Sequence, residues 1–140
     1  MTSTVVYDGN LRTVCTHLQS GTIIETDAPV DNQGNGERFS PTDIVSTALG
    51  SCMLTIMGIK ARDLNINLIG VKIEILKIMK SDPRRIGGIN LTFHFPENLV
   101  LSEKDQTILE RAAHTCPVIY SLNPEIEINT VFNWNKVEAI

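Results

Sequence analysis

The first part of the chain alternates apolar and polar positions in short runs separated by turn residues. Three such runs are expected to form strands, at residues 3–7, 11–18 and 21–27. Asp8-Gly9-Asn10 and Ser20-Gly21 are turn sequences that would join them. A polar stretch from Pro29 to Ser40, rich in Asn, Asp and Gly, predicts a loop. The chain therefore opens with a small three-stranded sheet.

A helical pattern begins where this loop ends. Ser40 is placed as the N-cap, Pro41 takes the first helical position, and Asp43 follows three residues after the cap. Apolar residues then recur at a spacing of four in two adjacent columns: Ile44/Val45, Ala48/Leu49, Cys52/Met53 and Ile56/Met57. We expect this helix to be buried broadly. Its uncharged run over 44–59 is 16 residues long, shorter than the roughly 20 apolar residues of a membrane span, so no membrane segment is predicted.

The second half of the sequence predicts a hairpin, a helix and a last strand. Apolar and polar residues alternate over 71–75 and 89–95, and Ser81-Asp82-Pro83 starts the turn of an antiparallel hairpin. Ser102 and Asp105 form the capping pair of a second helix.

The apolar column of that helix runs through Ile108, Ala112 and Cys116, and Pro117 limits its extension. A final strand over 126–134 places alternate apolar residues on one face. The element order β-β-β-α-β-β-α-β predicts an α+β fold in which two main helices pack on antiparallel sheets. No linker divides the chain, so residues 1–140 are expected to form one domain.

Composition narrows the classes of function. The 140 residues carry a net charge of −4, and the twelve Lys and Arg form no basic stripe, so nucleic acid is not an expected partner. The opening MTSTVVYDG lacks the basic and apolar regions of a signal peptide. Three cysteines are too few for a secreted disulfide framework. We expect a cytoplasmic protein whose disulfides are transient and catalytic.

Two of the cysteines fall on apolar helix faces that must pack against the same core. Cys52 and Cys116 are therefore able to meet, although a free cysteine also serves as an ordinary small buried residue. Small residues surround Cys52, which indicates close approach by another segment, and Pro117 follows Cys116 directly. A thioredoxin-type exchange motif is excluded because no C-x-x-C occurs. Cys15 lies on a predicted strand and is interpreted as structural.

A catalytic cysteine must be ionised, because the thiolate is the nucleophile. An ordinary cysteine has a pKa of about 8.5, and a nearby cation or helix N-terminus lowers it. Cys52 lies three turns inside its helix, where the helix dipole contributes little. An arginine is the natural activating group, because it stays charged and donates several hydrogen bonds. Periodicity alone does not select which arginine.

Two segments resemble those of the OsmC/Ohr family of hydroperoxide-resistance proteins. They are FSPTDIVSTALGSCM over 39–53 and AAHTCP over 112–117. Members carry a proline some eleven residues before the reactive cysteine, as Pro41 stands to Cys52, and a second cysteine in an A-H-x-x-C-P-like segment. In this chain Cys116 follows Cys52 by 64 residues. The resemblance extends over nearly the whole element order and implies the OsmC fold.

The resemblance also implies site residues. Cys52 would be the peroxidatic cysteine and Cys116 the resolving one. Arg12, 17 residues before Pro29, is similar in placement to the family's thiolate-stabilising arginine. The family's glutamate after the proline is replaced by Thr42, and Asp43 follows one position later. Asp43 would either hold Arg12 in place of that glutamate or serve only as a helix-start carboxylate.

The implied activity is reduction of organic hydroperoxides through a Cys52/Cys116 thiol–disulfide cycle, in defence against oxidative stress. The implied partners are a hydroperoxide, an external dithiol reductant and a second copy of the chain in an intertwined homodimer. No cofactor and no metal is expected, since His17, His114 and Cys116 match no zinc motif. Two alternatives stay open: a dimer that binds a small apolar ligand, and a stress protein without turnover.

Overall fold

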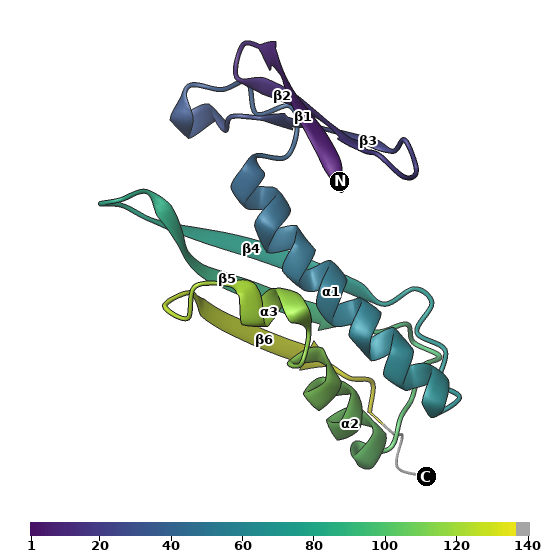
Figure 1. Cartoon of the computed structure of the whole chain (residues 1–140). Coiled ribbons are helices and arrows are strands. Elements are labelled where there is room, and N and C mark those ends of the chain that lie inside the picture. The colour runs from purple at the N-terminus through teal and green to yellow at the C-terminus, as the bar shows by residue number, and fades with distance from the viewer. Residues whose placement is uncertain (137–140) are drawn as a thin grey trace. The chain divides into compact units, whose positions relative to one another are not determined.

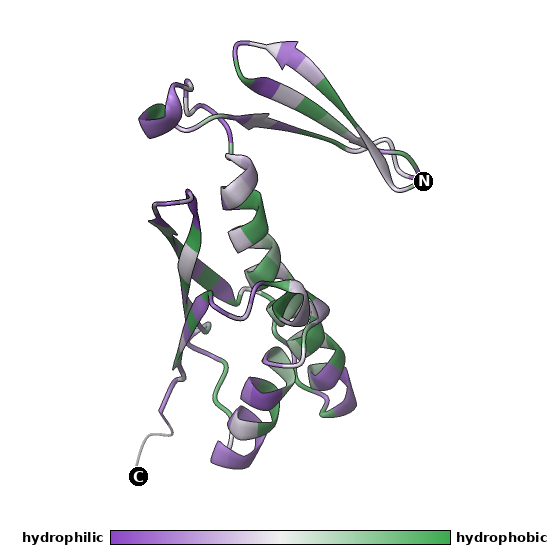
Figure 2. Cartoon of the chain, turned by 60° about the vertical axis from the view of Figure 1, so that its left-hand side comes forward, coloured by the Kyte–Doolittle hydropathy of each residue, from purple (hydrophilic) through white to green (hydrophobic). Residues whose placement is uncertain are grey.

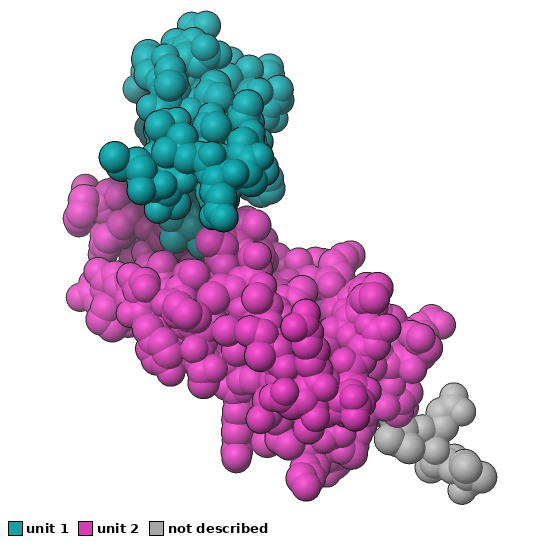
Figure 3. Space-filling model, turned by 45° about the vertical axis from the view of Figure 1, so that its right-hand side comes forward, with its two compact units in different colours: residues 1–45 teal, residues 46–140 magenta. Residues whose placement is uncertain are grey.

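The structure is a computed structural model that describes residues 1–136 (Figure 1). It divides the chain into two compact units, Met1–Val45 and Ser46–Ile140, coloured teal and magenta in Figure 3. A sheet of three strands lies in the first unit, and a second sheet of three strands with helices lies in the second. The α+β fold class predicted from the sequence is confirmed. The prediction of a single domain stays a prediction.

The first unit is an antiparallel meander. Its strands are β1 (Ser3–Gly9), β2 (Arg12–His17) and β3 (Ile23–Asp27), in that order across the sheet. Val5, Cys15 and Ile24 are opposite one another in the register. The turn between β1 and β2 is tight, and Asn10 and Leu11 both have positive φ. A short 3₁₀ helix, η1 (Val30–Asn32), follows in the predicted loop. The three strands were predicted to within two residues at each end.

Burial in this unit is the reverse of that in an ordinary core. The buried side chains within 1–45 are polar, namely Thr26, Asp27 and Ser40. The large apolar side chains of the strands are instead exposed, and successive residues of a strand point to opposite faces of the sheet: Val5, Val6, Tyr7, Ile23 and Ile24. In Figure 2 apolar (green) and polar (purple) positions follow one another along these strands.

Helix α1 (Pro41–Asp63) is the long element that leads into the second unit. Its N-terminus is the predicted capping box: the Asp43 N–H donates to Ser40 Oγ at 3.1 Å, and the Ser40 N–H donates to Asp43 Oδ2 at 2.9 Å. In one of the two predicted apolar columns Leu49, Met53 and Met57 are fully buried, and Ala61 extends this column by one turn, whereas its first member, Val45, is 38% exposed. By length and composition α1 is able to cross a membrane, but this column lies in the core of the second unit.

The second sheet supplies the other side of that core. Its order is β4 (Lys72–Lys80), β5 (Arg85–His94) and β6 (Glu127–Asn133). The β4–β5 pair is the predicted antiparallel hairpin. The central strand β5 directs Ile89, Leu91 and Phe93 inward, and each is at most 1% exposed. Phe93 stacks on Phe132 of β6 with ring centroids 4.3 Å apart.

Strand β6 corrects one expectation, because it runs parallel to β5 rather than antiparallel. The connection from β5 to β6 passes through α2 (Glu103–Ala113) and α3 (Pro117–Ser121). A helical crossover brings the chain back to the end at which the previous strand began, so the next strand points the same way. The second sheet is therefore mixed.

The end of the second helix is a further correction. α2 starts as predicted, with the Asp105 N–H donating to Ser102 Oγ at 3.2 Å, but it ends at Ala113, three residues before Cys116. Pro117 does not stop that helix; it occupies the first turn of α3. A proline disfavours the helical conformation in the residue before it, and Cys116 accordingly has φ −71° and ψ 143°. Cys116 thus lies at a junction and not on a helix face.

At Gly50 α1 packs closely against the sheet. A Cβ built on Gly50 would lie 2.6 Å from Ile75 Cδ1, whereas one built on Gly58 of the same helix meets nothing within 4 Å. Alanine gains about 1 kcal/mol over glycine in a helix interior, and overpacking a core costs roughly 1–3 kcal/mol. We therefore expect Gly50→Ala to be less stable than Gly58→Ala by about 1–3 kcal/mol, measured by denaturant unfolding. Equal stabilities would mean that Ile75 moves aside freely.

Candidate functional site

The structure brings the two cysteines predicted to react together. Cys52 lies on α1 in the half-buried column beside Ala48 and Ile56, and Cys116 lies at the α2–α3 junction in the core. Cys52 packs against the buried core of which Cys116 is a member, and both are free thiols. Cys52 is partly exposed, whereas Cys116 is 0% exposed. The second unit therefore holds one accessible thiol near one buried thiol.

Cys116 is the N-cap residue of α3. Its Sγ accepts a hydrogen bond from the Ile119 N–H at 3.4 Å, the place usually taken by a Ser, Thr, Asp or Asn oxygen. Burial is the main cause that raises the pKa of Cys116; the hydrogen bond from Ile119 opposes it, and the nearby Cys52 thiol adds to it. Cys116 is thus held as a neutral thiol. Of the pair, Cys52 is the member that a solute can reach.

The predicted activating residue, Arg12, lies on β2 of the first unit and forms a bidentate ion pair with Asp27 of β3. Arg12 Nε donates to Asp27 Oδ1 at 2.7 Å, and Arg12 Nη2 donates to Asp27 Oδ2 at 2.8 Å. The Asp27 side chain is only 1% exposed. The hydrogen bond with Asp27 is also the main cause that raises the pKa of Arg12, so the guanidinium is permanently charged.

Two more carboxylates surround this guanidinium. Glu37 Oε2 accepts from Arg12 Nη2 at 3.3 Å, and Glu25 Oε2 lies 3.8 Å from Arg12 Nε. Glu25 also pairs with Arg38 at 3.3 Å. The five side chains form what we call the Arg12 cluster (Arg12, Glu25, Asp27, Glu37 and Arg38), whose net formal charge is −1.

The sequence reading missed Asp27 as the partner of Arg12. The predicted turn at Ser20-Gly21 would place Arg12 opposite Pro29, whereas the observed register of the antiparallel pair places it opposite Asp27. Asp43 was expected either to hold Arg12 or to serve only as a helix-start carboxylate. The structure places Asp43 in the capping box of α1, and the carboxylates around Arg12 are those of Asp27, Glu37 and Glu25.

The Arg12–Asp27 pair predicts a pH dependence of stability. The hydrogen bond from Arg12 is the main cause that lowers the pKa of Asp27 from its ordinary 3.8. The folded state therefore binds fewer protons here than the unfolded chain, and the resulting stability is present above about pH 4 and lost as the pH falls through the folded pKa.

Accordingly, we expect Asp27→Asn to be less stable than the parent protein at neutral pH, with a difference that shrinks below about pH 4. Urea unfolding over a pH series measures it. Glu25→Gln is the matched control, because the Glu25 side chain is 37% exposed and lies farther from Arg12. A stability difference that does not change with pH would contradict the assigned pair.

The remaining candidates have local partners. Cys15 lies on β2 opposite Val5 and Ile24, His17 Nδ1 lies 2.6 Å from Ser20 Oγ, and His114 bonds the Glu110 carbonyl at 2.8 Å. Within residues 1–136, no three His, Cys, Asp or Glu side chains gather as metal ligands would.

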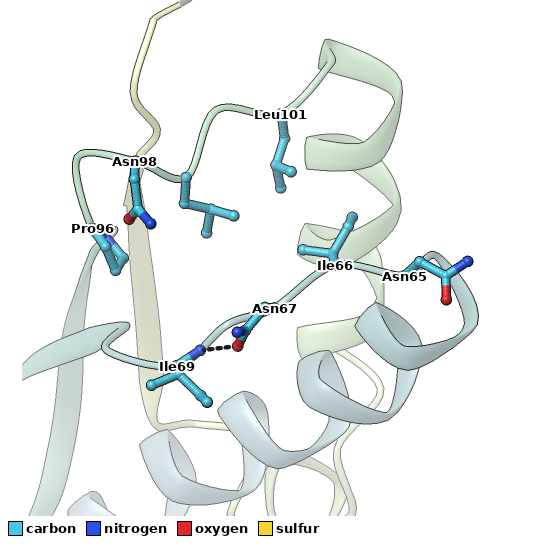
Figure 4. A pocket seen from close by; sticks show the side chains of 8 residues that line it. Asn65, Ile66, Asn67, Ile69, Pro96, Asn98 and Leu101 are labelled. Carbon is cyan, nitrogen blue, oxygen red and sulfur yellow. Dashed lines mark hydrogen bonds between the residues drawn. The ribbon is translucent and has the colours of Figure 1, made fainter.

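A cavity of about 290 Å³ lies in the second unit, at the loops after α1 and β5 (Figure 4). Its lining is Asn65, Ile66, Asn67, Ile69, Pro96, Asn98, Leu99 and Leu101. Within it the Asn67 side chain accepts from the Ile69 N–H at 2.9 Å. No cysteine and no ionisable side chain is among these described lining residues, so the cavity offers shape but no group that could react with a peroxide.

Comparison with known proteins places this arrangement in a family. Residues 34–131, which include both cysteines, match the family model of OsmC-like proteins. The chain belongs to the OsmC-like protein family. The resemblance drawn from the two sequence segments is thereby confirmed, and the family includes hydroperoxide-resistance proteins.

Solved structures of OsmC-like proteins have the same fold. A protein from Psychrobacter arcticus 273-4, named for an osmotic stress induced and detoxification response, is 50% identical, covers 95% of this chain and 96% of its own, and superposes with a TM-score of 0.91. The organic hydroperoxide resistance protein OsmC from Legionella pneumophila is 15% identical, with coverages of 94% and 96% and a TM-score of 0.73.

OhrB of Bacillus subtilis, an organic hydroperoxide resistance protein, is 18% identical, with coverages of 95% and 98% and a TM-score of 0.65. At these low identities OhrB and the Legionella protein support the fold alone. No match was found among curated proteins.

Proposed function

We propose that this OsmC-like protein reduces organic hydroperoxides with the thiols of Cys52 and Cys116. The observation that carries the proposal is that a partly exposed Cys52 packs against the core in which Cys116 is fully buried. Hydroperoxide-resistance proteins with the same fold support the substrate class. Cys52 is the attacking sulfur in this proposal, since the raised pKa of Cys116 keeps Cys116 protonated.

The cycle has three balanced steps. The Cys52 thiolate attacks the distal oxygen of the hydroperoxide, the O–O bond breaks, and the alkoxide takes a proton to leave as an alcohol; Cys52 becomes a sulfenic acid. The Cys116 sulfur then displaces hydroxide from that sulfenic acid, which leaves as water once protonated, and a disulfide forms. An external dithiol reduces the disulfide by exchange and is itself oxidised. The second step is favoured because Cys52 packs against the same core that contains Cys116.

Arg12 is proposed as the cation that serves the Cys52 thiolate, as the family resemblance implies. Its guanidinium uses Nε and Nη2 for Asp27 and Glu37. None of the described residues accepts a hydrogen bond from its Nη1, which leaves two N–H donors for a thiolate or a peroxide oxygen.

Titration of free thiols tests the proposed function directly. The reduced protein has three thiols per chain. One equivalent of cumene hydroperoxide should remove two of them and leave Cys15, with an intramolecular disulfide between Cys52 and Cys116 found by peptide mapping. Three thiols remaining after exposure would overturn the proposal and leave the binding-module and stress-protein alternatives.

A homodimer is part of the same proposal. The first unit has no hydrophobic core of its own and exposes Val5, Tyr7 and Ile24 together on one face. Ile59 on α1 is also 55% exposed. A second copy of the chain would bury these surfaces. We expect light scattering at micromolar concentration to give twice the 15.5 kDa mass of the chain. The mass of a single chain would contradict the proposed dimer. It would not affect the proposed thiol chemistry, which the thiol titration tests separately.

A further inference from the structure

We propose that Asp27 is a positioning residue for the thiol chemistry: it fixes the Arg12 guanidinium through a bidentate pair, so that only the Nη1 edge is presented to the reacting groups. This inference rests on the proposed function. It assigns to a strand residue the task that the family resemblance gives to a glutamate after the helix proline, where this chain has Thr42.

The first argument is the geometry of the pair. Two parallel contacts of 2.7 and 2.8 Å join the guanidinium to the Asp27 carboxylate, and a fork of this kind fixes orientation as well as distance. Asp27 is itself held on two sides, because its Oδ2 accepts from the Glu37 N–H at 3.1 Å and its own N–H donates to the Phe39 carbonyl at 3.1 Å. Arg12 is therefore bound to a carboxylate that cannot easily move.

The second argument is charge. The Arg12 cluster carries a net formal charge of −1, so its field does not favour a second anion at a distance. Arg12 can instead form directional hydrogen bonds through the two N–H donors on Nη1. Their usefulness depends on orientation, and Asp27 sets that orientation. Lysine at position 12 would keep the positive charge but would have neither the fork nor the second edge.

A double-mutant cycle on the reduced protein tests this role. The variants are Asp27→Asn, Arg12→Ala and their combination, with Glu127→Gln, at an exposed carboxylate of β6 outside the Arg12 cluster, as the control. Two rates are measured by stopped flow and mass spectrometry: oxidation of Cys52 by cumene hydroperoxide, and alkylation of Cys52 by iodoacetamide over a pH series, which requires a thiolate but no peroxidase activity.

Asp27→Asn should slow oxidation of Cys52 on the order of 10- to 100-fold, the effect of misplacing one aligned group, and should raise the pH midpoint of alkylation. Neither rate should fall further when Asp27→Asn is added to Arg12→Ala, because Asp27 acts through Arg12. Glu127→Gln should stay within about twofold of the parent protein, because exposed charges outside the Arg12 cluster contribute little. Arg12→Ala leaves Asp27 buried without its partner and could prevent folding. In that case Arg12→Lys takes its place in the cycle, and we expect it to slow oxidation and raise the alkylation midpoint as Asp27→Asn does.

The outcomes separate the inference from the proposed function. The positioning role would be overturned if Asp27→Asn kept the parent rates, or if it lowered the rates equally with and without the Arg12→Ala change. Either result would leave the peroxidase proposal in place. A different result is that the parent protein consumes no hydroperoxide while the variants still shift the pH midpoint of Cys52 alkylation non-additively. That result would overturn the peroxidase proposal and support the role of Asp27. Alkylation midpoints unchanged in both single variants would overturn the roles of Asp27 and Arg12 together.

Discussion

Replacing Cys52 by serine should reduce hydroperoxide consumption to the uncatalysed rate while the protein stays folded. The thiolate is the nucleophile, and a serine hydroxyl does not ionise at neutral pH, so no oxygen transfer can start. The exchange of sulfur for oxygen changes little volume at a position that is only half buried. Consumption of cumene hydroperoxide in the presence of dithiothreitol measures the loss, and circular dichroism reports the fold.

Cys15→Ser is the matched control for this experiment, because it removes a half-buried thiol from β2 of the first unit. It should keep the parent rate. Turnover that persists in Cys52→Ser would exclude Cys52 as the attacking residue. Loss of turnover in both serine variants would instead point to a general effect of removing thiols and would argue against a specific site.

Replacing Cys116 by serine should separate the first turnover from the later ones. Cys52 would still be oxidised by the first equivalent of peroxide, but its sulfenic acid would have no internal partner. Excess peroxide should then carry Cys52 on to the sulfinic acid, which ordinary thiols do not reduce. Steady-state turnover should fall to the slow rate at which an external thiol attacks the sulfenic acid.

The Cys116→Ser protein is expected to fold. Cys116 Sγ accepts a hydrogen bond from the Ile119 N–H, and a serine hydroxyl is a good N-cap acceptor for the same donor. Intact-mass spectrometry distinguishes the two results: a disulfide in the parent protein and a dioxygenated cysteine in the variant. A variant that keeps full turnover without overoxidation would show that Cys116 does not resolve the sulfenic acid.

These expectations depend differently on sequence and on structure. Local signals were sufficient for the elements. The capping box at Ser40 and Asp43, the hairpin turn at Ser81-Asp82-Pro83 and the N-cap at Ser102 each act within a few residues of the chain. The spacing-four column of α1 also predicted its buried face correctly, because helical periodicity is a property of the helix itself.

The sequence was less informative at the end of the second helix. The apolar column through Ile108 and Ala112 favoured extending α2 to Cys116, but α2 ends at Ala113. Pro117 restricts Cys116 to an extended conformation, and Cys116 is the cap of a new helix. The direction of β6 likewise followed from how the chain crosses through α2 and α3, which no strand pattern records.

The sequence by itself therefore determined the fold class and the family, because these follow from periodicity, capping and motif spacing, and it singled out Cys52 and Cys116 as candidates. Only the tertiary structure decided that Cys116 is fully buried in the core against which Cys52 packs and that Asp27 holds Arg12. Both arrangements involve residues at least 15 positions apart. Such arrangements depend on strand register and on how elements pack, and neither is encoded in any short segment of the chain.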